Sequence, residues 1–125
     1  DCDSKIFDIL GPNDILFIDS SHIIKPQGDV LKEYLEIIPN LKKGVIVHVH
    51  DIFTPRDYLD RWIREDVYFW NEQYLLETLI SNTDKYEVLA SLNYLKHIEF
   101  NMLKKVCPYL NKKREPASFY FRIKK

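Results

Sequence analysis

The stretch Gly44-Val45-Ile46-Val47-His48-Val49-His50-Asp51 decides the fold, because it is a run of β-branched apolar residues that ends in histidine and aspartate. An earlier stretch of the same kind is Asp14-Ile15-Leu16-Phe17-Ile18-Asp19-Ser20-Ser21-His22. Continuous apolar runs of this length are typical of strands that are buried on both faces of a parallel sheet. The sequence therefore predicts two neighbouring parallel strands, one over 14–19 and one over 45–50.

A helix is expected between these strands. Apolar residues recur at helical spacing over Val30–Ile38, Asp29 precedes them as the expected N-cap, and Pro39 follows them. A helix that connects two parallel strands of one sheet makes a right-handed crossover. The two strands and the helix form a β-α-β unit, and the polar residues at the strand ends lie at the carboxyl edge of the sheet.

The rest of the chain adds further elements. A short helical piece is predicted over 5–10, an irregular stretch over 52–69, a helix over 72–80 with Asn71 as its cap, a strand over 86–92, a helix over 93–106 and a last strand over 118–123. The inward face of the helix over 72–80 is expected to carry Tyr74, Leu75, Leu79 and Ile80. These elements predict a single α/β domain over 1–125.

The irregular stretch over 52–69 is dense in aromatic and charged residues. Connections of this length inside a compact domain are uncommon unless they serve as a lid or a binding loop. Packing of the aromatic rings against the body of the protein would explain the pattern as well. Both interpretations stay open from the sequence.

The composition limits the possible functions. Of the 125 residues, 46% are apolar and 30% are charged, and the net charge is −1. A near-neutral chain has no electrostatic reason to bind nucleic acid or a membrane surface. No apolar run approaches the roughly 20 residues of a membrane span. The two cysteines, Cys2 and Cys107, form neither a disulfide framework nor a metal-ligand spacing, so we expect a reducing, cytoplasmic compartment.

Two features predict that the sequence is part of a longer domain. The chain begins at Asp1 and not at a methionine. The strand over 14–19 is apolar on both faces, as a central strand is, and a central strand needs neighbours on both sides. The elements predicted above supply a neighbour on one side only.

Four polar residues lie at the carboxyl ends of the two predicted parallel strands, namely Asp19, His22, His50 and Asp51. Ligands of open α/β sheets bind at this edge. The two carboxylates could hold a divalent cation such as Mg²⁺. A histidine, whose ordinary pKa is about 6.5, could act as a general base. Alternatively, Asp19 and Asp51 cap the turns that follow them by accepting hydrogen bonds from backbone amides.

His48 and His50 point to the same face of their strand, an arrangement that binds zinc in some hydrolases. Such a site needs further ligands, and the remaining histidines are His22 and His97. His97 lies in the predicted helix over 93–106. A zinc hydrolase therefore ranks last among the functions considered, and we expect His48 to be a core histidine with a hydrogen-bond partner.

A pocket for a small acceptor molecule is a further possibility, close to the start of the helix over 72–80. Its candidate residues are Trp62, Trp70, Asn71, Glu72 and Tyr74, and we select Trp70 and Asn71 from them. Ordinary packing of an aromatic-capped helix is the alternative.

Together these motifs resemble a known family. The run Asp14–His22, an amphipathic helix and then Leu41–Ile52 look like the second half of a class I S-adenosylmethionine-dependent methyltransferase. More narrowly, they are similar to a group whose fourth strand ends Ile-Asp-x-x-His and whose fifth strand ends His-Asp. The resemblance covers residues 7–123, and many members of the group belong to bacterial sugar and polysaccharide pathways. It extends to the segments Phe53–Tyr58, Trp70–Glu72 and Ser118–Arg122.

The resemblance implies a Rossmann-like α/β fold. It implies a partial doubly wound sheet in which family strands four to seven lie in the order 4-5-7-6, with the last strand antiparallel. In metal-dependent relatives the positions of Asp19 and Asp51 supply carboxylates to a divalent cation, and His50 replaces what is often a second acid. The position of His22 resembles that of a candidate base or substrate contact.

The resemblance also implies an activity, the transfer of a methyl group from S-adenosylmethionine to an oxygen of a small molecule such as a sugar. Asp19 and Asp51 would orient the acceptor, directly or through Mg²⁺, and His22 or His50 would remove its proton. The half of the family's domain that holds the cofactor, with its glycine-rich turn and ribose-binding acid, is not in this sequence. We therefore expect the chain alone to be catalytically silent.

The alternative to an enzyme is an α/β module without catalytic activity. An apolar strand that is uncovered at the edge of a sheet can pair with a second copy of the chain. On this hypothesis the protein forms a homodimer through the strand over 15–18.

Overall fold

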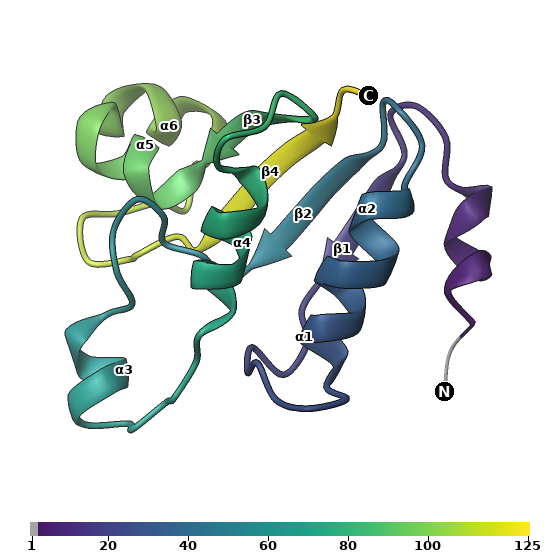
Figure 1. Ribbon diagram of the computed structural model, residues 1–125. Coiled ribbons are helices and arrows are strands. Elements are labelled where there is room, and N and C mark those ends of the chain that lie inside the picture. Colours follow the sequence, from purple (N-terminus) through teal and green to yellow (C-terminus); the bar gives the residue numbers. More distant parts are fainter. Residues whose placement is uncertain (1–2) are drawn as a thin grey trace.

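A computed structural model describes residues 3–125, so Asp1 and Cys2 lie outside the described part of the chain. Its centre is a four-stranded mixed sheet in the order β1-β2-β4-β3 (Figure 1). β1 and β2 run parallel, and β4 runs antiparallel to both of its neighbours. The predicted α/β class is confirmed, and the sheet is compatible with a Rossmann-like fold. The strands are β1 (Ile15–Ile18), β2 (Ile46–His50), β3 (Tyr86–Ser91) and β4 (Ser118–Ile123).

Helical segments connect and cover these strands. The expected crossover between β1 and β2 is present as α1, a π-helical turn η2 and α2, which follow one another without a break. The single helix expected over 93–106 is instead two helices, α5 and α6, because the backbone of Glu99 (φ −134°, ψ 44°) is not helical. The helical segments are η1 (Ser4–Ile9), α1 (Asp29–Lys32), η2 (Glu33–Ile37), α2 (Ile38–Asn40), α3 (Asp60–Arg64), α4 (Glu72–Ile80), α5 (Leu92–Ile98) and α6 (Phe100–Val106).

The expected N-cap of the crossover helix is wrong by one residue. Gly28 is the N-cap, and Asp29 is the first helical residue. The Asp29 carboxylate accepts hydrogen bonds from the backbone N–H and the hydroxyl of Ser21, at 2.9 and 2.5 Å. Burial alone would raise the pKa of Asp29, but the hydrogen bonds outweigh it and lower the pKa. Asp29 therefore ties the turn after β1 to the start of α1.

The core lies on one face of the sheet, beneath α1, α2 and α4 (Figure 1). Side chains alternate along each strand, so every second residue of β2 and β4 points into the core. Its fully buried residues include Val30, Ile38, Val45, Val47, Val49, Leu76, Phe121 and Ile123.

The opposite face of β1 is open. Ile15 and Phe17 point away from the core and are 57% and 54% exposed. β1 was expected to be a central strand that is buried on both faces. Within residues 3–125 it is an edge strand that pairs with β2 alone and is buried on one face.

Helix α4 differs from its prediction in two ways. Asn71 is at the N-cap position, but its side chain does not cap the helix and its Oδ1 accepts a hydrogen bond from the Ile24 N–H at 2.6 Å. Tyr74 was expected inward and is 45% exposed. The residues of α4 that are buried are Glu72, Gln73 and Leu76, with Leu75, Leu79 and Ile80 partly buried against the core.

The segment between β2 and α4 has more structure than the predicted irregular stretch over 52–69. It contains α3, and its aromatic residues Phe53 and Tyr58 are buried. The ring of Trp62 packs edge-on against Phe53 and Trp70, with centroids 5.2 and 5.0 Å apart. The segment is therefore packed against the body of the protein through its aromatic rings. In the described part of the chain, no helix is long and apolar enough to cross a membrane.

Candidate functional site

Asp19, His50 and Asp51 lie next to one another because β1 and β2 are parallel and in register. Ile18 pairs with Val49, so the residues that follow them, Asp19 and His50, meet at the carboxyl edge of the sheet. Asp51 is the next residue after β2. These three residues thus lie together at the carboxyl edge of the sheet, as the sequence predicted.

The backbone brings His22 to the same edge. His22 and Asp51 have φ angles of 58° and 56°, in the left-handed region that residues other than glycine seldom adopt. The His22 carbonyl accepts hydrogen bonds from the N–H groups of Asn71 and Glu72, at 3.0 and 3.2 Å. The first turn of α4 therefore holds the backbone of His22 in place. Residues with such backbone strain concentrate at functional sites.

The His22 side chain is buried and held by a carboxylate. Its Nδ1 lies 2.7 Å from Oε2 of Glu72, a side chain with no exposed surface. The hydroxyl of Tyr34 donates a hydrogen bond to the other oxygen of Glu72, Oε1, at 2.9 Å. Burial alone would lower the pKa of His22, but the hydrogen bond and the negative charges of Glu72, Asp51 and Asp19 outweigh it and raise the pKa. Tyr34, Glu72 and His22 thus form a buried chain of hydrogen bonds that ends at the site.

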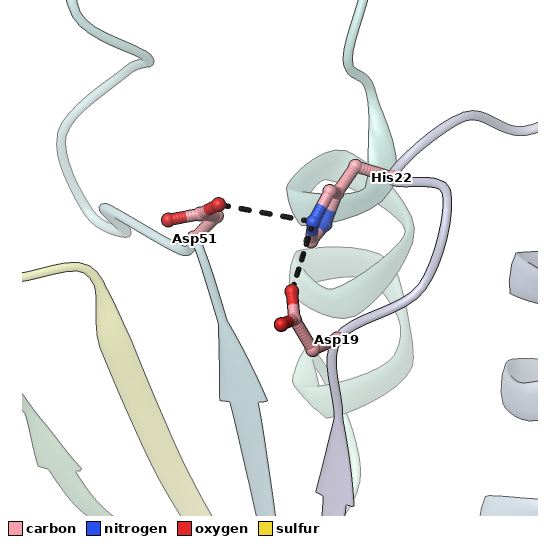
Figure 2. Close-up of side chains that lie close together, drawn as sticks. All are labelled: Asp19, His22 and Asp51. Carbon is pink, nitrogen blue, oxygen red and sulfur yellow. Dashed lines mark ion pairs between the residues drawn. The ribbon is translucent and has the colours of Figure 1, made fainter.

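The other ring nitrogen of His22 faces the two strand-end carboxylates (Figure 2). Its Nε2 lies 3.4 Å from Oδ1 of Asp19 and 3.8 Å from Oδ2 of Asp51. The three ligand atoms all lie within 4.8 Å of one another. Within residues 3–125, neither carboxylate accepts a hydrogen bond from a backbone amide, which argues against the turn-capping alternative. Two residues that were predicted as metal ligands and one that was predicted as a base therefore share one cluster.

Comparisons with known proteins do not assign the chain to a family. No family model, curated protein or solved structure matches the chain. The interpretation of the cluster rests on its own residues and contacts.

His50 lies beside the cluster, and its side chain is partly exposed. Its Nδ1 is 3.2 Å from Oδ1 of Asp51 and 3.7 Å from Oδ1 of Asp19, without the geometry of a hydrogen bond, and its side chain is 42% exposed. His50 is thus close to both carboxylates, and its buried Nδ1 has no hydrogen-bond partner among the described residues.

His48 differs from its prediction. We expected a hydrogen-bond partner, but Nε2 of His48 is buried without one in the described part of the chain. The ring stacks on Tyr120 with centroids 4.2 Å apart, and burial followed by the nearby His50 lowers its pKa. The cluster of three potential metal ligands found in residues 3–125 contains neither His48 nor His50. The geometry thus gives no support to a zinc hydrolase built on these two histidines.

Trp70 and Asn71, the predicted acceptor-pocket residues, both contact His22. The Trp70 ring lies 4.4 Å from the His22 ring and belongs to an aromatic cluster with Trp62 and Tyr68. Asn71 contacts His22 through its backbone, while its side chain binds the backbone of Ile24. Trp70 therefore packs on the ring of His22, and Asn71 holds the loop that carries His22.

Glu72 is the residue whose role sequence reasoning missed. It was considered only as a candidate residue of the acceptor pocket and not as a partner of His22, because 50 residues separate the two in the sequence. A signal was present nevertheless. Glu72 lies three, four and seven residues before Leu75, Leu76 and Leu79, so it shares the apolar stripe of its helix. An acid on such a stripe is buried, and a buried acid needs a partner.

The cluster can carry out two kinds of chemistry. Two carboxylates and an imidazole nitrogen provide three ligands for a divalent cation. The same carboxylates can accept hydrogen bonds from a hydroxyl group, with a histidine beside them to take its proton. Both uses place the reacting group at the carboxyl edge of β1 and β2, where ligands of α/β sheets bind.

Proposed function

We propose that this chain forms the C-terminal, acceptor-binding half of a class I S-adenosylmethionine-dependent methyltransferase that methylates an oxygen of a small molecule. The observation that carries the proposal is the convergence of Asp19, His22 and Asp51 at the ends of two adjacent parallel strands. The order β1-β2-β4-β3, with β4 antiparallel, is also the one expected for family strands 4-5-7-6.

The residues of this chain do not fit the cofactor itself. The family's glycine-rich turn would hold S-adenosylmethionine through backbone amides, and this chain has three isolated glycines. Gly28 is the N-cap of α1, and Gly44, with φ 91°, is in the tight turn before β2 that packs against Pro12. We therefore propose that the cofactor is held by residues outside this sequence and that these 125 residues alone are catalytically silent.

The proposed roles of the residues follow from their exposure. Asp19 and Asp51 orient the acceptor hydroxyl, directly or through a divalent cation, since one oxygen of each lies within 4 Å of Nε2 of His22. Of the two candidate bases, His50 is the more suitable, because its side chain is 42% exposed and that of His22 is 7% exposed. His22 is the less suitable, because its Nδ1 is bound to Glu72 and its Nε2 faces the carboxylates. The proton of the acceptor hydroxyl passes to the imidazole ring of His50 as the oxygen becomes nucleophilic.

A calorimetric titration tests this function. S-adenosylhomocysteine is titrated, with and without Mg²⁺, into this chain and into a version that is extended upstream of Asp1. We expect binding to the extended version only. Binding to neither would overturn the cofactor assignment. Methyl transfer by the 125-residue chain alone would contradict its proposed silence.

A second candidate function is self-association, and the exposure of β1 favours it. Ile15 and Phe17 are more than half exposed, and β1 pairs on one side only within residues 3–125. Unpaired edge strands can be extended by a second copy of the chain, and charges on such an edge oppose this. We expect gel filtration at rising concentration to show a dimer that Phe17→Lys returns to a monomer. A strict monomer at the highest concentration rules this candidate out.

A further inference from the structure

A cavity of about 500 Å³ lies apart from the cluster of Asp19, His22 and Asp51. The segment that leads into α3, the start of α5 and the segment that leads into β4 form its wall (Figure 1). Tyr58 lies in this wall and packs edge-on against Trp70, with ring centroids 6.4 Å apart. Cavities of this size hold small organic molecules. None of the three cluster residues lines the cavity, which is therefore a separate candidate site within residues 3–125.

Asn93 lines the cavity, and one atom of its buried amide has no partner. The residue is 1% exposed. Its Nδ2 donates hydrogen bonds to Oε2 of Glu115 at 2.9 Å and to the carbonyl of Pro116 at 3.2 Å. Because both partners are acceptors, they fix the amide with its oxygen on the other side. Within the described residues, this Oδ1 is buried and accepts no hydrogen bond. A buried oxygen without a donor is costly, so Asn93 favours a ligand that supplies an N–H or O–H group.

Glu115, which orients the Asn93 amide, is itself held from α5. The buried amine of Lys96 donates to one of its oxygens, and Nε2 of His97 lies 3.0 Å from the other. Burial alone would raise the pKa of Glu115, but hydrogen bonds with Lys96, His97 and Asn93 outweigh it and lower the pKa. Glu115 is therefore ionised at neutral pH, and the charge of Lys96 offsets its own. The Asn93 amide is thus oriented before any ligand binds.

The exposed part of the cavity carries a net negative charge. It is formed by the carboxylates of Asp57 and Asp60 and by the guanidinium of Arg56. Oδ1 of Asp57 accepts a hydrogen bond from the Tyr74 hydroxyl at 2.7 Å. In the described part of the chain, the carboxylate of Asp60 has no hydrogen bond or ion pair, and Arg56 pairs with neither acid. Two carboxylates against one guanidinium favour a cationic ligand over an anionic one.

We propose that this cavity binds the ammonium group of a small organic amine, which donates a hydrogen bond to Oδ1 of Asn93 and pairs with Asp60. An ammonium group has up to three N–H donors and no acceptor, so a single group matches a carbonyl oxygen and a carboxylate. A hydroxyl brings one donor and no charge, and a carboxylate brings no donor for Asn93. The inference goes beyond methyl transfer and stands on this cavity alone, so its test needs no cofactor.

Three probes of similar shape test the chemistry of the ligand. Benzylamine, benzyl alcohol and benzoate are titrated by calorimetry into the purified chain at neutral pH and low salt. We expect benzylamine to bind at least about tenfold more tightly than either of the others, since hydrogen bonds from a charged donor are the stronger ones. Equal or tighter binding of benzyl alcohol or benzoate would overturn the choice of an ammonium group. No binding of benzylamine at millimolar concentration would overturn the site itself.

NMR on the wild-type chain locates the amine. Benzylamine should shift the side-chain amide signals of Asn93 and leave those of Asn40 in place. Asn40 is the control, because it lines a different cavity and its amide already donates to the carbonyl of Glu36 at 2.7 Å. A shift at Asn40 without one at Asn93 would place the amine elsewhere and contradict the proposal. This measurement needs no substitution, so it does not depend on the folding of a variant.

A matched pair of aspartate variants tests the charge at the cavity. Asp60→Asn keeps the shape of the side chain and should weaken benzylamine binding by about three- to tenfold, because it removes the partner of the ammonium group. Asp8→Asn removes the same charge from an exposed residue that does not line the cavity, and it should leave the affinity unchanged. Equal effects of the two substitutions would overturn the pairing with Asp60.

Arg56→Gln gives a result of the opposite sign. It removes a charge that repels an ammonium group, so benzylamine should bind at least as tightly as it does to the wild type. A loss of benzylamine affinity in this variant would mean that the cavity does not select a cation.

Discussion

Replacing Glu72 by alanine should lower the free energy of unfolding at pH 7 by about 3–5 kcal/mol. Glu72 is completely buried, and its two oxygens bind His22 and the Tyr34 hydroxyl. Removing it leaves the His22 ring and the Tyr34 hydroxyl without their partner in the interior, and an uncompensated buried charge or polar group is costly. Urea denaturation followed by circular dichroism measures the loss.

A surface glutamate provides the control for this prediction. Glu65, at the end of α3, is 74% exposed at its side chain and pairs with Arg61 at 4.0 Å. Glu65→Ala should change the free energy of unfolding by less than about 0.5 kcal/mol, because exposed ion pairs contribute little. If Glu72→Ala and Glu65→Ala had the same small effect, the buried hydrogen-bond chain would not stabilise the fold.

Replacing Phe121 by alanine should lower the free energy of unfolding by about 3–5 kcal/mol. Phe121 lies on β4, is completely buried, and packs edge-on against Tyr86 at 5.6 Å. β4 is hydrogen-bonded to β2 on one side and to β3 on the other, so its backbone cannot shift far to close the cavity that the ring leaves. Urea denaturation gives the change in the free energy of unfolding, and the slope of the transition shows whether unfolding remains two-state.

Phe69 is the matched control, since it is 76% exposed. Phe69→Ala removes the same ring from the surface and should change the free energy of unfolding by at most about 0.5 kcal/mol. A loss below about 1 kcal/mol for Phe121→Ala would mean that the core collapses around the cavity far more readily than buried aromatic sites usually do.

The strands could be predicted from the sequence where the pattern of apolar residues within one short segment identifies them. The apolar runs before Asp19 and Asp51 predicted β1 and β2 to within a residue or two, and the alternating pattern of Ser118–Ile123 matched β4 at both ends. The division of 93–106 into α5 and α6 could not be predicted, because its apolar spacing continues across the break at Glu99. Tyr74 was placed inward by the same spacing rule, but its hydroxyl bonds Asp57 at the surface.

The candidate site was predicted in part. Asp19, His50 and Asp51 could be brought together from the sequence because a parallel register aligns strand ends. The orientation of His22 could not, since it depends on a left-handed backbone angle and on the carboxylate of Glu72, 50 residues away. Helix periodicity places Glu72 on the buried stripe of α4, but it does not identify the polar groups that Glu72 contacts there.

The position of β4 in the sheet also determines when the protein can fold during synthesis. Within residues 3–125, β3 joins the sheet through β4 alone, and β4 is the last strand of that range. While the chain is growing on the ribosome, β3 has no strand to pair with, and one side of β2 stays open until residues 118–123 emerge. The sheet therefore closes after the ribosome has released this part of the chain, and until then a nascent chain needs protection from pairing with its neighbours.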